Sequence, residues 1–198
     1  HLETRNPGDV GAWLADANMV VRAAEIVTPD GGTEIRVRDD SHAPWRTLAR
    51  APSGDRFDLI DFSRDGASIY FESSVGADTT RVMRRDIKTG RDQLIAASDT
   101  ADVEDVMIHP VRRRIEAAAI EAARRKWIVA DNYVAADLRA LRELAGSDDF
   151  EVLSRDLKDD EWLVAVNGDR DSARYYLWDR TGRKATFLFA ARPALKDL

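Results

Sequence analysis

The chain has 198 residues, of which 44% are apolar and 33% are charged, a balance typical of globular proteins with a sizeable core. Its formal net charge of −6 argues against a surface dedicated to nucleic acid. The absence of cysteine excludes disulfides, thiolate catalysis and cysteine zinc sites, and no apolar run approaches the ~18 residues that cross a bilayer. These features leave the compartment open between cytoplasm and periplasm.

Short strand candidates fill the first half of the chain in two groups, 11–50 and 57–97. In the first group the turn Thr28-Pro29-Asp30-Gly31-Gly32 separates two strand candidates, with proline and glycine at positions that suit a β-turn. The second group has four strand candidates, and the period of two places Ile69 and Phe71 on one face of its second strand. Each group is therefore predicted to be a four-stranded antiparallel unit.

A third group, 103–131, is less regular. Its middle segment, 115–123, has a helical composition rich in alanine and glutamate, but its position in the pattern calls for a strand. We predict a strand there. The period then changes, because Val134, Leu138, Leu141 and Ala145 share one helical face and Gly146 follows as a helix-ending residue. This predicts a helix over about 133–145, inserted before a fourth strand group at 150–191.

Two motifs recur between the second and fourth groups. An aspartate followed by Thr-Gly-Arg joins two apolar segments at 82–95 and again at 174–189, which predicts a hairpin with glycine at positive φ in both places. Ser63-Arg64-Asp65 and Ser154-Arg155-Asp156 precede apolar strands in the same two groups. Repeats of roughly 40–45 residues with four short strands are typical of propeller blades. We therefore predict an all-β fold, a single partial β-propeller domain over 1–198 with about four four-stranded blades and one inserted helix.

Four stretches resemble the non-catalytic β-propeller of prolyl oligopeptidase family serine peptidases of the acylaminoacyl or dipeptidyl peptidase type. They are Asn6-Pro7-Gly8-Asp9 before Trp13, Ser63-Arg64-Asp65-Gly66, Ile108-His109-Pro110 ahead of Trp127 and the helix, and the segment 175–195. The second departs from the family's Ser-Pro-Asp-Gly turn at Arg64. The resemblance covers nearly the whole chain. Similar turns also occur in the propeller of the Tol-system periplasmic protein.

The resemblance implies a propeller that covers an α/β-hydrolase domain and limits access to short or unfolded peptides. In that domain a G-x-S-x-G elbow holds the nucleophile, and no such motif occurs in the 198 residues. We therefore expect a fragment without catalytic residues or cofactor, whose partners are the peptidase domain of the same parent chain and, in the parent, peptide substrates. An alternative is a stand-alone propeller that binds proteins or peptides. A hydrolase of unrecognised type is the least favoured interpretation.

Candidate catalytic and metal residues are few. The histidines are His1, His42 and His109, and none accompanies a nucleophile motif, so they are interpreted as terminal, turn and strand-end residues. Acidic clusters occur at Asp39-Asp40 beside His42 and at Asp169 with Asp171. Neither matches the twelve-residue calcium loop, so solvated turn acids are the favoured interpretation and no metal site is predicted.

Two basic runs, 112–114 and 124–126, flank the strand candidate at 115–123. A solvated rim is the favoured interpretation, and the alternative is a patch that contacts an acidic surface on the peptidase domain or a partner subunit. Arg113 and Arg125 represent this patch, and charge reversal at both is its test. An excised propeller also exposes strand edges and blade faces, which predicts a homodimer or an aggregation-prone monomer. The tryptophans are expected to fill the space between blades.

Overall fold

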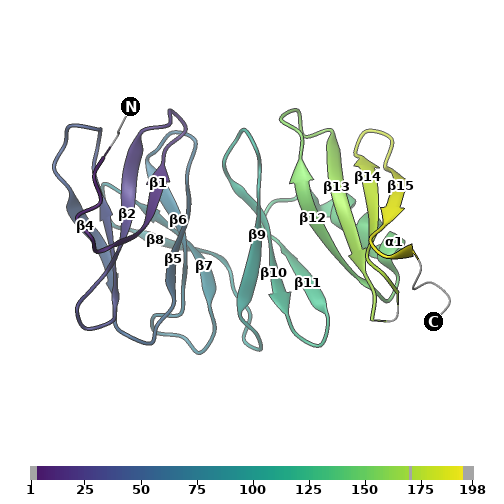
Figure 1. Ribbon diagram of the computed structural model, residues 1–198, viewed down its shortest axis with the longest axis horizontal. Coiled ribbons are helices and arrows are strands. Elements are labelled where there is room, and N and C mark those ends of the chain that lie inside the picture. The colour runs from purple at the N-terminus through teal and green to yellow at the C-terminus, as the bar shows by residue number, and fades with distance from the viewer. Residues whose placement is uncertain (1–3, 170, 194–198) are drawn as a thin grey trace. The chain divides into compact units, whose positions relative to one another are not determined.

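The computed structural model describes residues 4–169 and 171–193, which form fifteen strands and one helix (Figure 1). The chain divides into two compact units. One runs to Glu104 and also includes Arg112–Arg114, and the other comprises Asp105–Val111 and the chain from Ile115 onward. The prediction that 1–198 is a single domain stays a prediction. Within the described residues, no helix has the length and apolar character needed to cross a bilayer.

The first unit contains two four-stranded antiparallel blades whose strands pair in chain order. The first blade consists of β1 (Val10–Ala15), β2 (Val21–Val27), β3 (Thr33–Val37) and β4 (Arg46–Ala51). The second consists of β5 (Phe57–Phe62), β6 (Ser68–Ser73), β7 (Arg81–Asp86) and β8 (Asp92–Ala96). Their shared core joins Phe57, Phe62, Ile69 and Phe71 of the second blade to residues of the first, including Ile35. Apolar residues at alternate strand positions therefore bury one face of each blade against the other.

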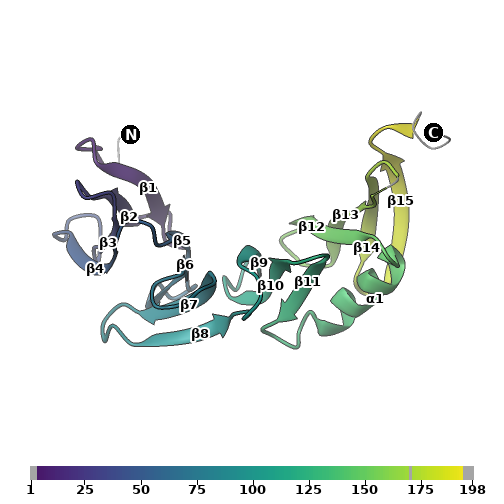
Figure 2. The same cartoon turned by 90° about the horizontal axis from the view of Figure 1, so that it is seen from below.

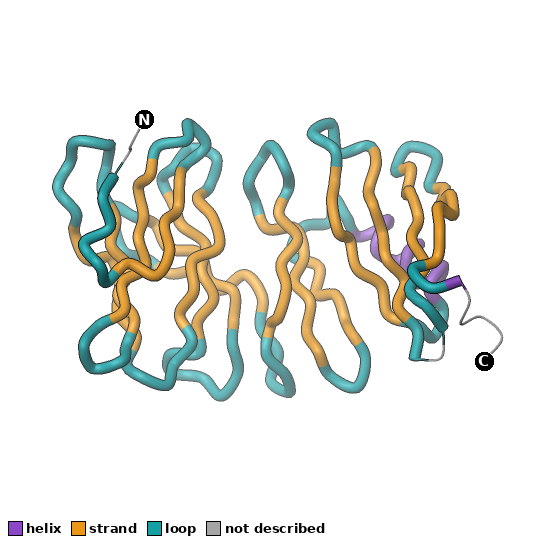
Figure 3. Tube along the Cα trace, in the orientation of Figure 1, coloured by secondary structure: helices purple, strands orange, loops and turns teal. Residues whose placement is uncertain are grey.

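The second unit contains the remaining two blades and the helix. The third blade has three strands, β9 (Val103–Ile108), β10 (Ile115–Glu121) and β11 (Arg125–Val129), and the fourth has four, β12 (Asp149–Arg155), β13 (Glu161–Asn167), β14 (Arg174–Asp179) and β15 (Lys184–Ala190). The helix α1 (Ala135–Ala145) lies between them in sequence (Figure 3). The predicted all-β architecture of four blades and one helix is confirmed, and the third blade departs from the expected four strands.

Two uncertain elements are settled by burial. The segment predicted as a strand against its helical composition is β10, in which Ala117, Ala118 and Ala119 are fully buried. A central strand buried on both faces tolerates consecutive alanines, so tertiary context overrides their helix propensity. The helix turns its predicted face inward, because Leu138 and Leu141 pack in the same core as Trp162 and Trp178 of the fourth blade. Figure 2 shows α1 beside the strands of that blade.

The two repeated motifs have different outcomes. Thr-Gly-Arg follows Asp86 between β7 and β8 and follows Asp179 between β14 and β15, so this repeat is structural. Gly90 has the expected positive φ of 71°, but in the fourth blade Arg183 takes it, at 48°, and not Gly182. Gly182 is required for space instead, because a Cβ there would lie 2.7 Å from Oδ2 of Asp179.

The Ser-Arg-Asp repeat does not mark equivalent positions. Ser63 follows β5 and starts a turn, where its N–H donates to the Ser68 carbonyl at 2.9 Å. In the fourth blade Asp156 has this place, because its N–H donates to the Glu161 carbonyl at 3.0 Å. Ser154 and Arg155 still belong to β12. The shared letters are therefore offset by two residues in the structure, although each motif precedes the second strand of its blade as predicted.

Candidate functional site

The predicted turn acids and histidines do not converge on one site. Asp40 accepts hydrogen bonds from the backbone N–H groups of His42 and Ala43 at 2.7 and 2.9 Å, and Asp39 pairs with Arg46 at 3.4 Å. His42 has a solvent-exposed side chain. Among the described residues, no group of three or more histidine, aspartate or glutamate side chains is placed to hold a metal ion. His1 lies outside the described residues.

The two arginines chosen to represent a patch lie in different compact units. Arg113 is 3.5 Å from the carboxylate of Asp61, and burial raises the pKa of Asp61 although the charge of Arg113 opposes the shift. Arg125 is largely buried and binds Glu121 at 2.6 Å and Glu151 at 3.0 Å. Both guanidinium groups thus have acidic partners within their own unit. Their role in contacting a partner stays a prediction.

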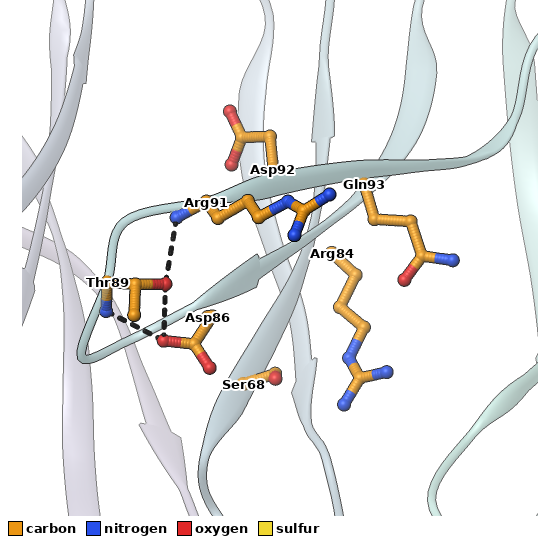
Figure 4. A pocket seen from close by; sticks show the side chains of 7 residues that line it. All are labelled: Ser68, Arg84, Asp86, Thr89, Arg91, Asp92 and Gln93. Atoms are coloured by element: carbon orange, nitrogen blue, oxygen red, sulfur yellow. Dashed lines mark hydrogen bonds between the residues drawn. The ribbon is translucent and has the colours of Figure 1, made fainter.

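A polar hollow of about 740 Å³ lies over the outer strands of the second blade, β7 and β8 (Figure 4). Its acids are already engaged: Asp86 accepts hydrogen bonds from Thr89 N–H at 2.7 Å and from the Thr89 hydroxyl at 2.8 Å, which lower its pKa. Asp92 binds Arg85 through two contacts of 2.6 Å. Both carboxylates that line the hollow are therefore bound by neighbouring residues of the same blade.

The densest polar arrangement is a buried cluster in the second unit. We call it the Asp159 cluster; it comprises Glu116, Asp137, Arg155, Asp159 and Arg180. They come from β10, α1, the end of β12, the β12–β13 turn and the β14–β15 turn. Elements far apart in the sequence therefore contribute charges to one interior site.

Asp159 lies at the centre of the cluster, 1% exposed. Its Oδ1 accepts hydrogen bonds from Arg155 Nε at 2.6 Å and from the indole N–H of Trp162 at 2.8 Å, and Arg180 binds its Oδ2. Burial alone would raise the pKa of Asp159, but the hydrogen bonds from Arg155 and Trp162 and the charges of both arginines outweigh burial and lower it. The carboxylate is thus held ionised in the interior.

Arg180 joins the turn of Asp159 to the helix. Its Nη2 donates to Oδ2 of Asp137 at 2.8 Å, and the other oxygen of Asp137 accepts the indole N–H of Trp178 at 3.1 Å. The guanidinium is 4.5 Å from the ring centroid of Tyr133 and 4.7 Å from that of Trp162. Burial opposes ionisation, but hydrogen bonds to Asp137 and Tyr133 and the acidic charges raise the pKa of Arg180. The planar cation therefore has both charge and ring partners.

Arg155 extends the cluster to the third blade. Its Nη2 is 2.8 Å from Oε2 of Glu116, which is fully buried on β10, and its guanidinium lies 4.8 Å from the Trp162 ring centroid. Buried charges of this kind persist only when they are paired, because desolvation of an isolated ion is very unfavourable. The cluster therefore requires β10, β12 and α1 to be in place together.

His109 gives the cluster a superficial likeness to a catalytic dyad. Its Nε2 is 3.9 Å from Asp159, but its Nδ1 accepts a hydrogen bond from Val111 N–H at 3.1 Å, and the ring is 5% exposed. A dyad needs a nucleophile within hydrogen-bond reach of the histidine and a free orienting carboxylate. Asp159 instead binds two arginines and a tryptophan, so we interpret the cluster as a structural element that holds β10, β12 and α1 together.

Sequence reasoning missed this cluster. The sequence predictions include Arg155 only as part of the repeated Ser-Arg-Asp motif and assign no buried role to Asp159. One local signal was available: the β12–β13 turn needs a left-handed residue, and it has Asp159 with φ of 63° in place of a glycine. A non-glycine residue at such a position is uncommon and indicates a side chain with specific partners.

No protein-family model matches the chain. The chain is 29% identical over 197 residues to dipeptidyl aminopeptidase BIII of Pseudoxanthomonas mexicana. The alignment covers 98% of this chain and 28% of that relative. Among solved structures, a prolyl endopeptidase has a TM-score of 0.58 at 14% identity, over 84% of this chain and 24% of its own. TolB from Acinetobacter baumannii has a TM-score of 0.55 at 11% identity, over 91% of this chain and 43% of its own.

The structural likenesses identify the fold, and the sequence match is to part of a dipeptidyl aminopeptidase. The chain spans 28% of the length of the curated relative that it matches. Together these findings confirm the resemblance predicted from the sequence: the chain is similar to the β-propeller portion of a prolyl oligopeptidase family peptidase.

Proposed function

We propose that this chain is a non-catalytic propeller segment of a serine peptidase, which packs on an α/β-hydrolase domain outside the chain and restricts substrate access to it. The alignment of 98% of the chain with part of a dipeptidyl aminopeptidase is the observation that carries the proposal. The absence of G-x-S-x-G from the 198 residues supports it. The contacts of His109 support it as well, because its Nδ1 accepts a hydrogen bond from Val111 N–H and its Nε2 faces Asp159, which two arginines already bind.

The test compares the full-length parent with the 198-residue chain. Both are assayed on short N-acylated and free-amino peptides, with and without a serine-directed inhibitor. We expect cleavage by the parent alone and its loss with the inhibitor. Cleavage by the 198-residue chain would contradict the non-catalytic role, and no cleavage by either protein would contradict the peptidase assignment.

Restriction of access is tested by substrate length in the same parent. A propeller that covers an active site admits short or unfolded peptides and excludes folded ones. We therefore expect kcat/KM to fall steeply from a short peptide to a folded protein that contains the same cleavable sequence. Unfolding that protein substrate should restore cleavage. Equal cleavage of the folded and unfolded forms would contradict the gating role without affecting the peptidase assignment.

A second candidate is a stand-alone propeller that binds proteins or peptides. The fold likeness to TolB, with a TM-score of 0.55, favours considering it. If neither the parent nor this chain cleaves any peptide, this candidate takes precedence. Its own test is capture of a defined peptide by the isolated chain.

We also propose that the isolated chain forms a homodimer. Strand β15 is at the edge of its sheet, and it exposes Phe187, Leu188 and Phe189, each at more than two fifths of its surface. Exposed apolar edge strands pair with other chains. Sedimentation at high micromolar concentration should show a dimer, and Leu188→Lys should weaken it. A monomer with ordinary thermal stability at that concentration would contradict the proposal.

A further inference from the structure

The third blade ends one strand earlier than its neighbours. Its strand order is β11-β10-β9, and the chain leaves β11 for the helix α1 (Figure 1). No other strand of the described residues pairs with the outer edge of β11. An edge strand presents a row of backbone N–H and C=O groups that can pair with another extended chain.

Two hydrogen bonds show which backbone groups of β11 face outward. Ala130, just after the strand, donates its N–H to the Glu116 carbonyl at 2.9 Å, toward β10. Arg125 instead donates its N–H to the carboxylate of Asp149 at 3.1 Å, away from β10. Backbone groups alternate in direction along a strand, so those of Trp127 and Val129 point outward with those of Arg125.

A groove of about 760 Å³ lies between β11, the helix α1 and the segment that leads into β12. Apolar side chains line its base: Trp127 and Val129 from β11, Leu138 from α1, and Phe150 from β12. Trp127 and Phe150 stack with ring centroids 6.1 Å apart. Because Leu138 and Phe150 are buried, the apolar surface beside the open edge comes from Trp127 and Val129.

The lining of the groove is basic in a chain whose net charge is −6. It includes no aspartate or glutamate, and its cations are Arg124, Arg125, Lys126, Arg139 and Arg142. Arg124 is bound by Asp169, Arg125 by Glu121 and Glu151, and Arg142 lies 4.0 Å from the carboxylate of Asp149. Lys126 and Arg139 are exposed, and neither has an acidic partner within the part of the chain that the structure describes. Two cations thus remain available to an incoming anion.

We propose that this groove binds an extended acidic peptide, which adds to β11 as the fourth strand of the third blade. Main-chain hydrogen bonds to the outward groups of Trp127 and Val129 would supply affinity, as in other cases of strand addition. Every second side chain of the peptide would contact the apolar side chains of the groove, and the acidic side chains between them would pair with Lys126 and Arg139. The inference does not depend on the peptidase assignment.

The first test uses a fluorescein-labelled decapeptide of alternating glutamate and valine, titrated with the full 198-residue chain. Fluorescence anisotropy should show saturable binding that weakens as salt is raised. A matched peptide of alternating lysine and valine should not bind. No binding by the acidic peptide, or equal binding by both, would overturn the proposal.

The second test reverses the two available cations. Lys126→Glu with Arg139→Glu should weaken binding by about tenfold or more, since each reversal removes one surface ion pair and adds repulsion. The matched control is Lys88→Glu with Arg91→Glu, the same charge change at exposed positions by the β7–β8 turn of the second blade. It should leave affinity within about twofold. Circular dichroism establishes that both variants fold. Equal weakening by the two pairs would mean general attraction to positive charge and would overturn the proposal.

The third test asks whether the peptide binds as a strand. Two versions of the decapeptide are made, one with backbone N-methyl groups at the odd residues and one with them at the even residues. Each version lacks the backbone N–H donors along one edge of the strand and keeps those along the other. One version should lose binding and the other should retain it, because only one edge faces β11. If both bind as the parent peptide does, or if a single-stranded oligonucleotide displaces the peptide with the same dependence on Lys126 and Arg139, the groove is a polyanion surface and strand addition is wrong.

Discussion

The contact between the first two blades and the contact between the last two use equivalent backbone positions with different side chains. In the first unit, Arg22 is the second residue of β2 and lies 5.3 Å from the ring centroid of Phe62, which ends β5. Gly66 in the following turn has φ of 66°, and a Cβ there would collide with Nη1 of Arg22. Beside the apolar core that the two blades share, these positions of the contact hold one cation, one ring and one glycine.

In the second unit, Glu116 is the second residue of β10, Arg155 ends β12, and Asp159 has the left-handed turn position with φ of 63°. A cation on one blade and a ring on the next are thus replaced by an anion and a cation, and the glycine by a buried carboxylate. A left-handed turn residue therefore need not be glycine when interactions of its side chain offset the energetic cost of the backbone conformation.

The difference has a thermodynamic consequence. A buried ion cluster adds little net stability over an apolar contact, because desolvation offsets much of the attraction between charges. Removal of one member is nevertheless severe, since it leaves the others charged and buried. The second unit should therefore be more sensitive than the first to single changes at this position.

The largest effect is expected for Asp159→Ala. It leaves Arg155 and Arg180 without their shared anion, so the free energy of unfolding should fall by about 3–5 kcal/mol. Urea titration followed by tryptophan fluorescence reports this, because Trp162 and Trp178 are in the core of the same unit. Asp159→Gly is the matched control for backbone strain and should recover about 1 kcal/mol of the loss. An Asp159→Gly variant as stable as the parent would contradict a stabilising role for the carboxylate.

A smaller effect is expected for Gly66→Ala in the first unit. The left-handed backbone position costs a non-glycine residue about 1–2 kcal/mol, and the new methyl group displaces the mobile end of Arg22. The measurement is the same urea titration. Arg22→Ala in the Gly66→Ala background should relieve the collision but not the backbone strain. Full recovery in the double variant would mean that strain at this turn is negligible.

Acid should destabilise the second unit through Asp159. Its pKa is lowered in the folded state, so its contribution is present above the unfolded pKa of about 3.9 and is lost as pH falls through the lower folded value. Each unit of lowering corresponds to about 1.4 kcal/mol. Unfolding free energies measured from neutral pH into this range should fall less steeply in Asp159→Asn than in the parent. Parallel profiles would exclude Asp159 as the source.

The smallest effect is expected at the surface pair Arg85–Asp92 of the second blade, which is partly exposed. Asp92→Asn should change the free energy of unfolding by less than about 1 kcal/mol, because solvent screens such pairs and the side chains lose entropy in forming them. Measured beside Asp159→Asn, it separates a buried carboxylate from an exposed one. A loss comparable to that of Asp159→Asn would contradict the distinction between the two environments.

Much of the fold could be predicted because its determinants are local. The alternation of Ile69 and Phe71, the turn at 28–32 and the helical face of Leu138 and Leu141 each depend on residues a few positions apart. The Ser-Arg-Asp repeat shows the limit of such local patterns: three matching letters carry no information on where the preceding strand ends. Of the candidate site, the sequence predicted only absences and two basic runs.

The sequence by itself determined four groups of strands and one inserted helix, since strand period, turn chemistry and helical spacing are properties of neighbouring residues. Its motifs also carried the resemblance to a peptidase propeller. Tertiary structure alone decided two further features: the joining of Glu116, Asp137, Arg155, Asp159 and Arg180 in one buried cluster, and the open edge of β11. Each of them depends on desolvation and pairing between segments far apart in the chain, and such interactions leave no local periodicity to detect.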